Sequence, residues 1–282
     1  MEIISADSRQ VYRGMDIGTA KVSRAEQARI PHHGLDLVEP DEPFSVADYV
    51  RHTGGALAGI AERGAVALLV GGTGLYLRAV GRGLALDALP SDAELRARLE
   101  ADLAAEGPAP LVARLVELAP RLAATVELRN PRRVVRALEI ALLAGDRPRP
   151  SPRGYPGPTL WLGLDVEHDA HRDWILDRAR EQFAAGLLEE AATLRERFDP
   201  ALPAFSAIGY REAWAVLDGQ LTLEAAIELD ARRNVAFARR QRTWFRAEPG
   251  IDWLPAADRP GAQALARVRR FLDEAGVSSG VS

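Results

Sequence analysis

Two side chains that could take part in a reaction follow two predicted strands. Asp7 lies just past the apolar segment Glu2–Ser5, after Ala6. Thr73 lies in the glycine turn Gly71–Gly74, which comes directly after the apolar segment 65–70. Open α/β folds bind ligands at the carboxyl ends of their strands. There a carboxylate can accept a proton from an attacking group, and a glycine turn that begins a helix can bind an anion through its backbone N–H groups.

Each of these features has a purely structural alternative. Asp7 and Ser8 are also suited to cap the next turn, and the glycine turn can serve only the backbone dihedrals of a tight connection. Lys21 follows Gly18, but the second glycine and the hydroxyl residue of a P-loop are absent, and the Walker A pattern occurs nowhere in the 282 residues. The sequence therefore does not predict a nucleotide kinase.

Two clusters of arginine offer possible phosphate contacts. The first crowds the start of a predicted helix and comprises Arg129, Arg132, Arg133 and Arg136. The second, 231–246, holds six arginines and no acid. On a helix its Arg232, Arg239 and Arg246 share one face, and Phe237 with Trp244 would anchor the opposite face in a core. Either cluster can bind RNA or can simply be a solvated helix face.

Composition limits the possible functions. The net charge is −4, so any contact with RNA is expected to be local. The chain has no cysteine, and its five histidines include no metal-type pair on a helix, which excludes disulfides and structural zinc. It has no apolar run long enough to span a bilayer and no signal sequence after Met1. We therefore expect a cytoplasmic protein without membrane contact.

Secondary-structure signals predict an α/β core with a helical insertion. The segments 2–5, 65–70 and, more weakly, 161–166 are continuous apolar runs typical of parallel strands, and helical patterns separate them. The stretch 91–145 contains only helical signals. We therefore expect a helical insertion at 87–155, between core segments at 1–86 and 156–282.

The insertion carries clear helix boundaries. Ser91 and Glu94 form a capping-box pattern, with Gly107 ending the run, and Asn130 and Gly145 bound a helix whose apolar stripe is Val134, Val135, Leu138 and Leu142. The segment 146–158 has five prolines in thirteen residues and is predicted to be a non-helical linker.

Ordered blocks across nearly the whole chain resemble the tRNA dimethylallyltransferase family. These blocks are ISADSRQVYRGMDIGTAK (4–21), PHHGLDLVEP (31–40), FSVADYV (44–50), LLVGGTGLYLRA (68–79), NPRRVVRALEI (130–140), AIGYREAW (207–214) and RRQRTWFR (239–246). The resemblance implies a P-loop NTPase-like parallel-sheet core whose helical insertion grips the tRNA anticodon stem-loop.

The same resemblance implies an activity. The expected reaction moves a dimethylallyl group from dimethylallyl diphosphate to N6 of the adenosine on the 3′ side of the anticodon, in tRNAs that read codons beginning with U. Diphosphate is the second product, Mg²⁺ is the expected cofactor, and the expected enzyme is a monomer. The target base would flip into a channel that the diphosphate substrate enters from the other end.

Particular residues match the family's functional positions. Asp7 matches the aspartate that takes the proton of the adenine amine, and Thr73 and Arg178 match diphosphate-binding residues, with Gly71, Gly72 and Gly74 beside them. The expected tRNA contacts are Asp7, Ser8, Arg9, Gln10, Arg132, Arg133, Val134, Val135, Arg136, Ser206, Ala207, Ile208, Gly209, Tyr210, Arg211, Arg239, Arg240, Arg242 and Arg246. Ser206 departs from the family, because many relatives have arginine there.

A larger departure concerns the phosphate-binding loop. Family members carry a strand, a P-loop and a helix ahead of the segment that matches Glu2–Ser5, and we expect this N-terminal strand and P-loop to be missing here through a misplaced start codon or a truncated gene. Two alternatives therefore stay open. One is a non-catalytic tRNA-binding remnant; the other is an adenylate isopentenyltransferase, which the arginine-bearing insertion disfavours because a free nucleotide needs no stem-loop grip.

Overall fold

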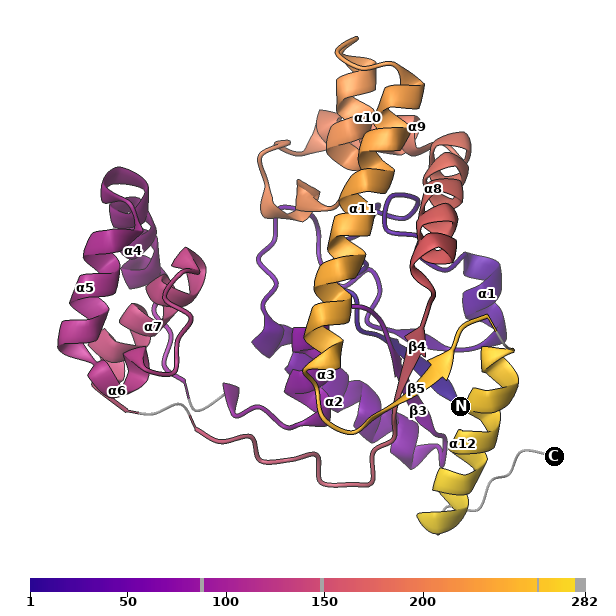
Figure 1. Cartoon of the computed structure of the whole chain (residues 1–282), viewed down its shortest axis with the longest axis horizontal. Helices are drawn as coiled ribbons and strands as arrows, with labels where there is room; N and C mark the ends of the chain where they lie inside the picture. Colours follow the sequence, from indigo (N-terminus) through magenta and orange to yellow (C-terminus); the bar gives the residue numbers. More distant parts are fainter. Residues whose placement is uncertain (87–88, 148–149, 258, 277–282) are drawn as a thin grey trace. The chain divides into compact units, whose positions relative to one another are not determined.

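The computed structural model describes residues 1–86, 89–147, 150–257 and 259–276. The chain forms two compact units (Figure 1). Unit 1 combines Met1–Gly81 with Tyr155–Ser282, and unit 2 is Arg82–Gly154.

Unit 1 contains two parallel sheets. The first joins β1 (Glu2–Ser5), β2 (His32–His33) and β3 (Ala67–Val70) in the order β2-β1-β3. The second pairs β4 (Trp161–Asp165) with β5 (Ile251–Pro255). The predicted parallel α/β core is therefore confirmed. Because Ser5 is in register with Val70, β1 and β3 end at the same level, and the residues that follow them are neighbours.

Helices surround both sheets. They are α1 (Arg24–Arg29), α2 (Val46–Glu62), α3 (Gly74–Gly81), α8 (His168–Ala184), α9 (Leu187–Arg197), α10 (Tyr210–Leu217), α11 (Leu223–Arg246), α12 (Pro260–Glu274) and the 3₁₀ helix η2 (Pro203–Ser206). α2 begins with a capping box, in which Ser45 Oγ accepts from Asp48 N and the Asp48 side chain accepts from Ser45 N. None of the helices within the described ranges has the length and apolarity that crossing a membrane requires.

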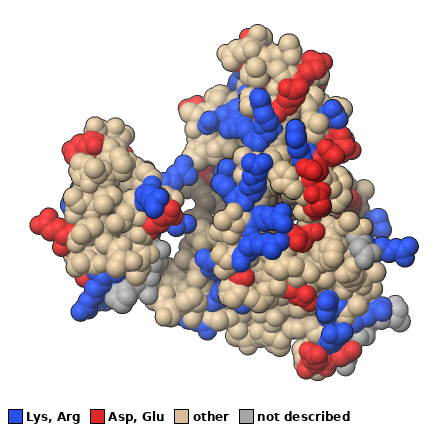
Figure 2. Space-filling view, viewed as in Figure 1, with Lys and Arg blue, Asp and Glu red and all other residues tan. Residues whose placement is uncertain are grey.

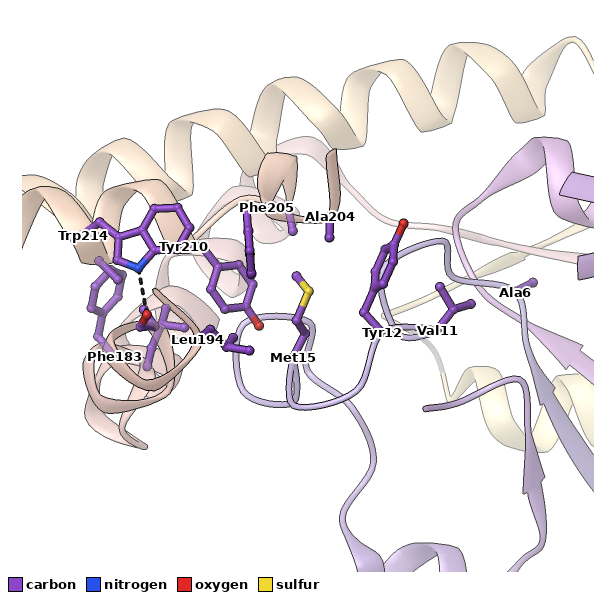
Figure 3. Close-up of a cluster of buried hydrophobic side chains, with 14 of the residues drawn as sticks. Ala6, Val11, Tyr12, Met15, Phe183, Leu194, Ala204, Phe205, Tyr210 and Trp214 are labelled. Atoms are coloured by element: carbon purple, nitrogen blue, oxygen red, sulfur yellow. Dashed lines mark hydrogen bonds between the residues drawn. The ribbon is translucent and has the colours of Figure 1, made fainter. Parts of the chain in front are cut away.

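A single apolar cluster ties the loop after β1 to the helices of unit 1 (Figure 3). Figure 3 shows it running from Trp214 and Phe205 to Met15 and Tyr12. The rings of Phe205 and Trp214 meet edge to face at 5.2 Å, and Trp214 Nε1 donates to the Ala191 carbonyl at 2.8 Å. The loop that follows Asp7 is therefore held by buried packing.

Unit 2 is helical, with α4 (Ala93–Glu106), α5 (Pro108–Leu118), α6 (Pro120–Ala123) and α7 (Pro131–Ala144). α7 matches the prediction, because Asn130 Oδ1 accepts from Arg133 N and the next residue after the helix is Gly145 at φ 75°.

Two details of the sequence prediction need adjustment. The capping box at Ser91 is wrong, because Asp92 is the residue that caps α4, through Leu95 N. Leu142 is 37% exposed and does not join the core stripe. The linker is non-helical in its described part, and residues 148–149 lie outside the described residues.

Candidate functional site

Asp7 and Thr73 lie at one site, as the strand ends predicted. Ser8 N donates to Thr73 Oγ1 at 3.0 Å, and Thr73 N donates to the Ala6 carbonyl at 3.0 Å. These two bonds lock the loop after β1 onto the glycine turn after β3. A carboxylate and a hydroxyl from adjacent parallel strands therefore share the carboxyl edge of the first sheet.

Asp7 also has the structural role that was the alternative. Its Oδ1 accepts from Arg9 N at 2.7 Å and so closes a local turn. No described residue donates to its second oxygen, Oδ2, and the residue is only partly buried. One oxygen thus orients the carboxylate, and the other is available to a substrate.

The glycine turn is tightly packed, because neighbouring atoms lie where a Cβ atom would stand on Gly71 and Gly74. A Cβ on Gly71 would stand 2.3 Å from the Ala6 carbonyl oxygen, and a Cβ on Gly74 would stand 2.4 Å from the Trp244 ring. Gln241 Nε2 donates to the Gly72 carbonyl at 3.0 Å. Glycine is thus required by close approach, and α11 covers one side of the turn.

Arg9 and Gln10 brace the loop after β1. Arg9 donates to the Pro203 carbonyl at 2.9 Å and to Ser206 Oγ at 2.8 Å, which fixes η2 beside the site. Gln10 accepts from Ser5 Oγ at 2.8 Å. Both residues hold the protein's own structure together, in addition to their expected contact with tRNA.

Lys21 is a structural residue. Its side chain is 3% exposed, and Nζ contacts carboxylate oxygens of Asp16 and Asp36 at 2.6 Å each. Because two carboxylates of the protein already neutralise its charge, Lys21 is not placed as a P-loop lysine would be. This agrees with the sequence pattern.

Glu190 was not identified from the sequence and organises the segment 16–18. Its carboxylate accepts from the backbone N–H groups of Asp16, Ile17 and Gly18 at 3.0, 2.7 and 3.0 Å, and from Tyr210 Oη at 2.8 Å. Its partners are up to 174 positions away, so no local pattern could have indicated this role.

Three of the expected tRNA contacts in 206–211 are buried. Tyr210 is 0% and Ala207 is 8% exposed, and Gly209 is buried as well, with its N–H bonded to Glu212 Oε2 at 3.0 Å. Burial, followed by the nearby charge of Glu190, raises the pKa of Tyr210 far above its ordinary value. These residues belong to the core, so the expected contact of this stretch with tRNA stays a prediction that rests on its exposed positions. Ser206 and Arg211 are exposed, and Ile208 is partly so.

The arginines of α11 form a basic row on the surface (Figure 2). Figure 2 shows blue side chains gathered along the place that α11 occupies in Figure 1. Arg242 and Arg246 are held by Asp165 at the end of β4, at 3.2 and 3.0 Å. Arg239 lies 3.4 Å from His168 Nε2, and Arg240 is exposed.

Only one of the two predicted aromatic anchors of α11 is correct. Trp244 packs on Gly74, and the Arg78 guanidinium lies 4.3 Å from its ring centroid. Phe237 is 40% exposed and is not a core residue.

Arg178 does not contact the glycine turn directly. It is an exposed residue of α8, and its Nη2 lies 3.4 Å from Asn234 Oδ1 on α11. Gln241, which holds the turn, is seven residues further along α11, or about 10 Å by helical rise. Asn234 and Gln241 thus lie on one face of α11, two turns apart. Arg178 and the glycine turn that holds Thr73 contact this same face.

The arginines of α7 have different surroundings. Arg132 is exposed and has no partner among the described residues. Arg133 pairs with Glu127 at 2.8 Å, and Arg136 pairs with the buried Glu139 at 2.7 Å. Burial of Glu139 raises its pKa, but hydrogen bonds led by that from Arg96 outweigh this, and the net pKa lies below the ordinary value.

Val134 and Val135 are core residues of unit 2, at 1% and 3% exposure. The apolar face of α7 that carries them is turned inward, so the expected contact of this stretch with tRNA stays a prediction that rests on its exposed arginines.

Open pockets also occur away from this site. Two of about 500 Å³ each lie in unit 1, one beside Gly186 and one beside Trp253, and neither is lined by Asp7 or Thr73.

Comparison with known proteins places these features in a family. The family model described as IPP transferase matches residues 10–248. The chain belongs to the IPP transferase family. The resemblance found in the ordered sequence blocks is thus confirmed.

Curated relatives of this IPP transferase family member match along nearly their whole length. It is 44% identical to the tRNA dimethylallyltransferase of Roseiflexus sp. strain RS-1, over 96% of this chain and 90% of the relative. It is 42% identical to the enzyme of that name from Thermus thermophilus, over 96% and 89%.

Solved structures share the fold. The tRNA isopentenylpyrophosphate transferase of Bacillus halodurans superposes with a TM-score of 0.70 at 38% identity, covering 98% of this chain and 89% of that one. A eukaryotic dimethylallyltransferase acting on tRNA superposes with a TM-score of 0.80 at 24% identity, covering 99% and 75%, and so supports the fold alone.

Proposed function

We propose that this IPP transferase family member transfers a dimethylallyl group from dimethylallyl diphosphate to N6 of the adenosine on the 3′ side of the tRNA anticodon. The observation that carries the proposal is the joining of Asp7 and Thr73 at adjacent strand ends by the Ser8 N–Thr73 Oγ1 bond of 3.0 Å. The relatives' names support the choice of substrate class.

The proposed chemistry is a balanced substitution. N6 of adenine forms a bond with C1 of the allyl group, the C1–oxygen bond breaks, and its electron pair leaves with the diphosphate. The N6 proton passes to Asp7, whose Oδ1 is already held by Arg9 N at 2.7 Å. Backbone N–H groups of the glycine turn, Thr73 and Arg178 offset the charge of the departing diphosphate.

Mg²⁺ is part of the proposal. No group of three or more acidic, histidine or cysteine side chains suited to a metal is found among the described residues. This fits Mg²⁺ held mainly by diphosphate oxygens, since that ion commonly takes only one or two carboxylates and several waters from its surroundings. Thr73 is the candidate protein ligand, and the ion would supply charge compensation for the diphosphate.

A further parallel strand fits the open sheet edges of unit 1. β3 pairs only with β1 and β4 only with β5 among the described strands, and both strands end beneath the Gln241–Arg246 stretch of α11. At the other ends, Trp161 of β4 packs on Gly81, where α3 returns from β3. Leu68, Val70 and Leu164 on these strands are 37%, 49% and 58% exposed. We propose that β3 and β4 flank the strand that carries the family's P-loop.

A fusion protein tests this proposed position of the strand between β3 and β4, which we call the slot. A strand, P-loop and helix of the family's form, joined ahead of Glu2, are expected to raise both the melting temperature and the turnover rate, because they cover the apolar edge strands and add phosphate donors. A matched fusion whose P-loop lysine is alanine is expected to keep the stability gain and to lose the gain in turnover. A fusion that leaves the melting temperature unchanged contradicts the slot.

Replacement of Arg132 by alanine tests the contact with tRNA. We expect weaker tRNA binding, and a slope of log affinity against log salt that is shallower by about one, because one phosphate contact is lost. Arg114, an exposed arginine of α5, is the matched control, and its alanine variant is expected to keep the slope. Fluorescence anisotropy at several salt concentrations measures both, and equal slopes for the two variants contradict the assignment.

The decisive experiment is incubation with unmodified tRNA, dimethylallyl diphosphate and Mg²⁺, followed by mass spectrometry of the nucleosides. Dimethylallyladenosine in tRNA supports the proposal. Tight tRNA binding without product supports the non-catalytic remnant, and product formed only from free adenosine monophosphate supports the adenylate enzyme.

We propose that the chain acts as a monomer in the cytoplasm.

A further inference from the structure

The contact between α8 and α11 brings together side chains far apart in the sequence. The helices pack through Ile175, Ala179 and Ala231. His168 is opposite Arg239 at 3.4 Å, and Arg178 is opposite Asn234 at 3.4 Å. Residue numbers rise along one helix as they fall along the other, so the helices are antiparallel. We call this contact, together with the end of β4, the α8–α11 seam.

The seam carries an excess of positive and titratable nitrogen groups. These are His168, His171, Arg178, Arg239 and Arg242. Three carboxylates face them. Asp165 lies 3.2 Å from Arg242 and also holds Arg246, and the exposed Asp169 lies 3.3 Å from His168. Asp230 lies behind Asn234, close enough to Arg178 for its charge to be felt. Such an excess of donors is the chemistry that recognises a multiply charged anion.

Arg178 differs from its neighbours on the two helices. Arg180 pairs with Asp177 at 3.0 Å, and Arg233 pairs with Glu212, so these arginines are neutralised. The described partner of Arg178 is the neutral amide oxygen of Asn234. That oxygen faces Arg178 because Asn234 Nδ2 donates to Asp230 Oδ1 at 2.8 Å.

His171 lies on the same face of α8 as Arg178, two turns nearer the helix start. This places it toward the part of α11 where Gln241 binds the Gly72 carbonyl. Partial burial, then the charges of Arg178 and Arg242, and last His168, lower the pKa of His171. No carboxylate is among the described groups that shift it, so its surroundings in the free protein favour the neutral imidazole.

We propose that His171 is a further anion-binding residue, which takes up a proton from solvent and contacts the diphosphate between Arg178 and Arg242. The inference rests on the proposed function, because it takes the anion to be diphosphate. No substrate bond changes in this step: a neutral imidazole becomes an imidazolium as the anion arrives. A bound anion with two or more negative charges outweighs the positive charge of the nearby arginines at His171. The empty site therefore disfavours protonation of the His171 imidazole, and the filled site favours it.

Histidine NMR with inorganic pyrophosphate tests the proposal. With ¹³C-labelled histidine, and with the His171→Gln variant to assign the signal, we expect the pKa of His171 to rise on saturation with pyrophosphate. His52 is the internal control, because burial also lowers its pKa but it belongs to α2. A pKa of His171 that stays unchanged at saturation, or no binding of pyrophosphate, overturns the proposal.

Calorimetry gives a second, independent result. We expect H171Q to bind pyrophosphate several-fold more weakly than the parent protein at pH 6 and almost equally at pH 8. Protonation of pyrophosphate itself affects both proteins alike, so their difference isolates His171. An H32Q variant, which changes a half-buried histidine of β2, is the control for folding and charge. Identical affinities of H171Q and the parent protein at pH 6 contradict the proposal.

The two proposals fail separately. A shift of the His171 pKa with pyrophosphate, but no prenylated tRNA, retains the anion site and rejects the proposed reaction. Prenylated tRNA without the shift retains the reaction and rejects the role of His171.

Discussion

Replacement of Asp7 by asparagine is expected to lower turnover by about 10²- to 10⁴-fold, the range for loss of a positioned proton acceptor. The amide keeps an oxygen for the Arg9 N–H, whose 2.7 Å bond closes the local turn, so the loop should stay in place. What is lost is the charge and basicity of the second oxygen. Single-turnover kinetics with tRNA and dimethylallyl diphosphate measure this effect.

The binding of tRNA separates a chemical role from a structural one. We expect D7N to bind tRNA within about two-fold of the parent protein, since the carboxylate contributes no phosphate contact. Asp41, an exposed residue outside the site, provides a matched control, and D41N is expected to keep full turnover. Parallel loss of binding and turnover in D7N would show that Asp7 only holds the loop.

Replacement of Gly71 by alanine is expected to lower turnover by about 10²-fold, because a misplacement near 1 Å can cost that much. Its added Cβ would meet the Ala6 carbonyl oxygen at 2.3 Å and the Ala6 carbonyl carbon at 2.4 Å. Both atoms are backbone and cannot rotate away, so the loop bearing Asp7 must move relative to Thr73. Overpacking of this kind also costs about 1–3 kcal/mol of stability.

Gly54 provides the matched control for this substitution. It lies in α2, and nothing stands within 4 Å of a Cβ added there. We expect G54A to keep turnover and to gain up to about 1 kcal/mol, because alanine favours a helix interior over glycine. Urea unfolding and single-turnover rates distinguish the variants, and full turnover in G71A would refute the claim that this close approach positions the site.

Local signals were sufficient for much of the fold. The apolar run at Glu2–Ser5 became β1 with the predicted bounds, and Asn130 and Gly145 bound α7 as expected. Strand periodicity and helix caps depend on residues a few positions apart, so a single sequence contains them. The juxtaposition of Asp7 and Thr73 was also predictable, because parallel strands align their carboxyl ends.

The burial of individual side chains was harder to predict from the sequence. Val134 and Tyr210 lie within stretches expected to contact tRNA, but both are in the core, whereas Phe237 was expected in the core and is exposed. A stretch of sequence contains both faces of its helix, and only packing against other elements decides which face meets solvent.

The sequence by itself determined the family, the parallel α/β core and the two strand ends that hold the proposed acid–base and anion groups. Only the tertiary structure decided that Glu190 holds the 16–18 segment, that Lys21 is neutralised, and that His171 lies among arginines. These depend on contacts between residues 5 to 174 positions apart, the longest of which no periodic pattern can encode. The physical reason is that burial and charge at a site are properties of every chain segment that converges there.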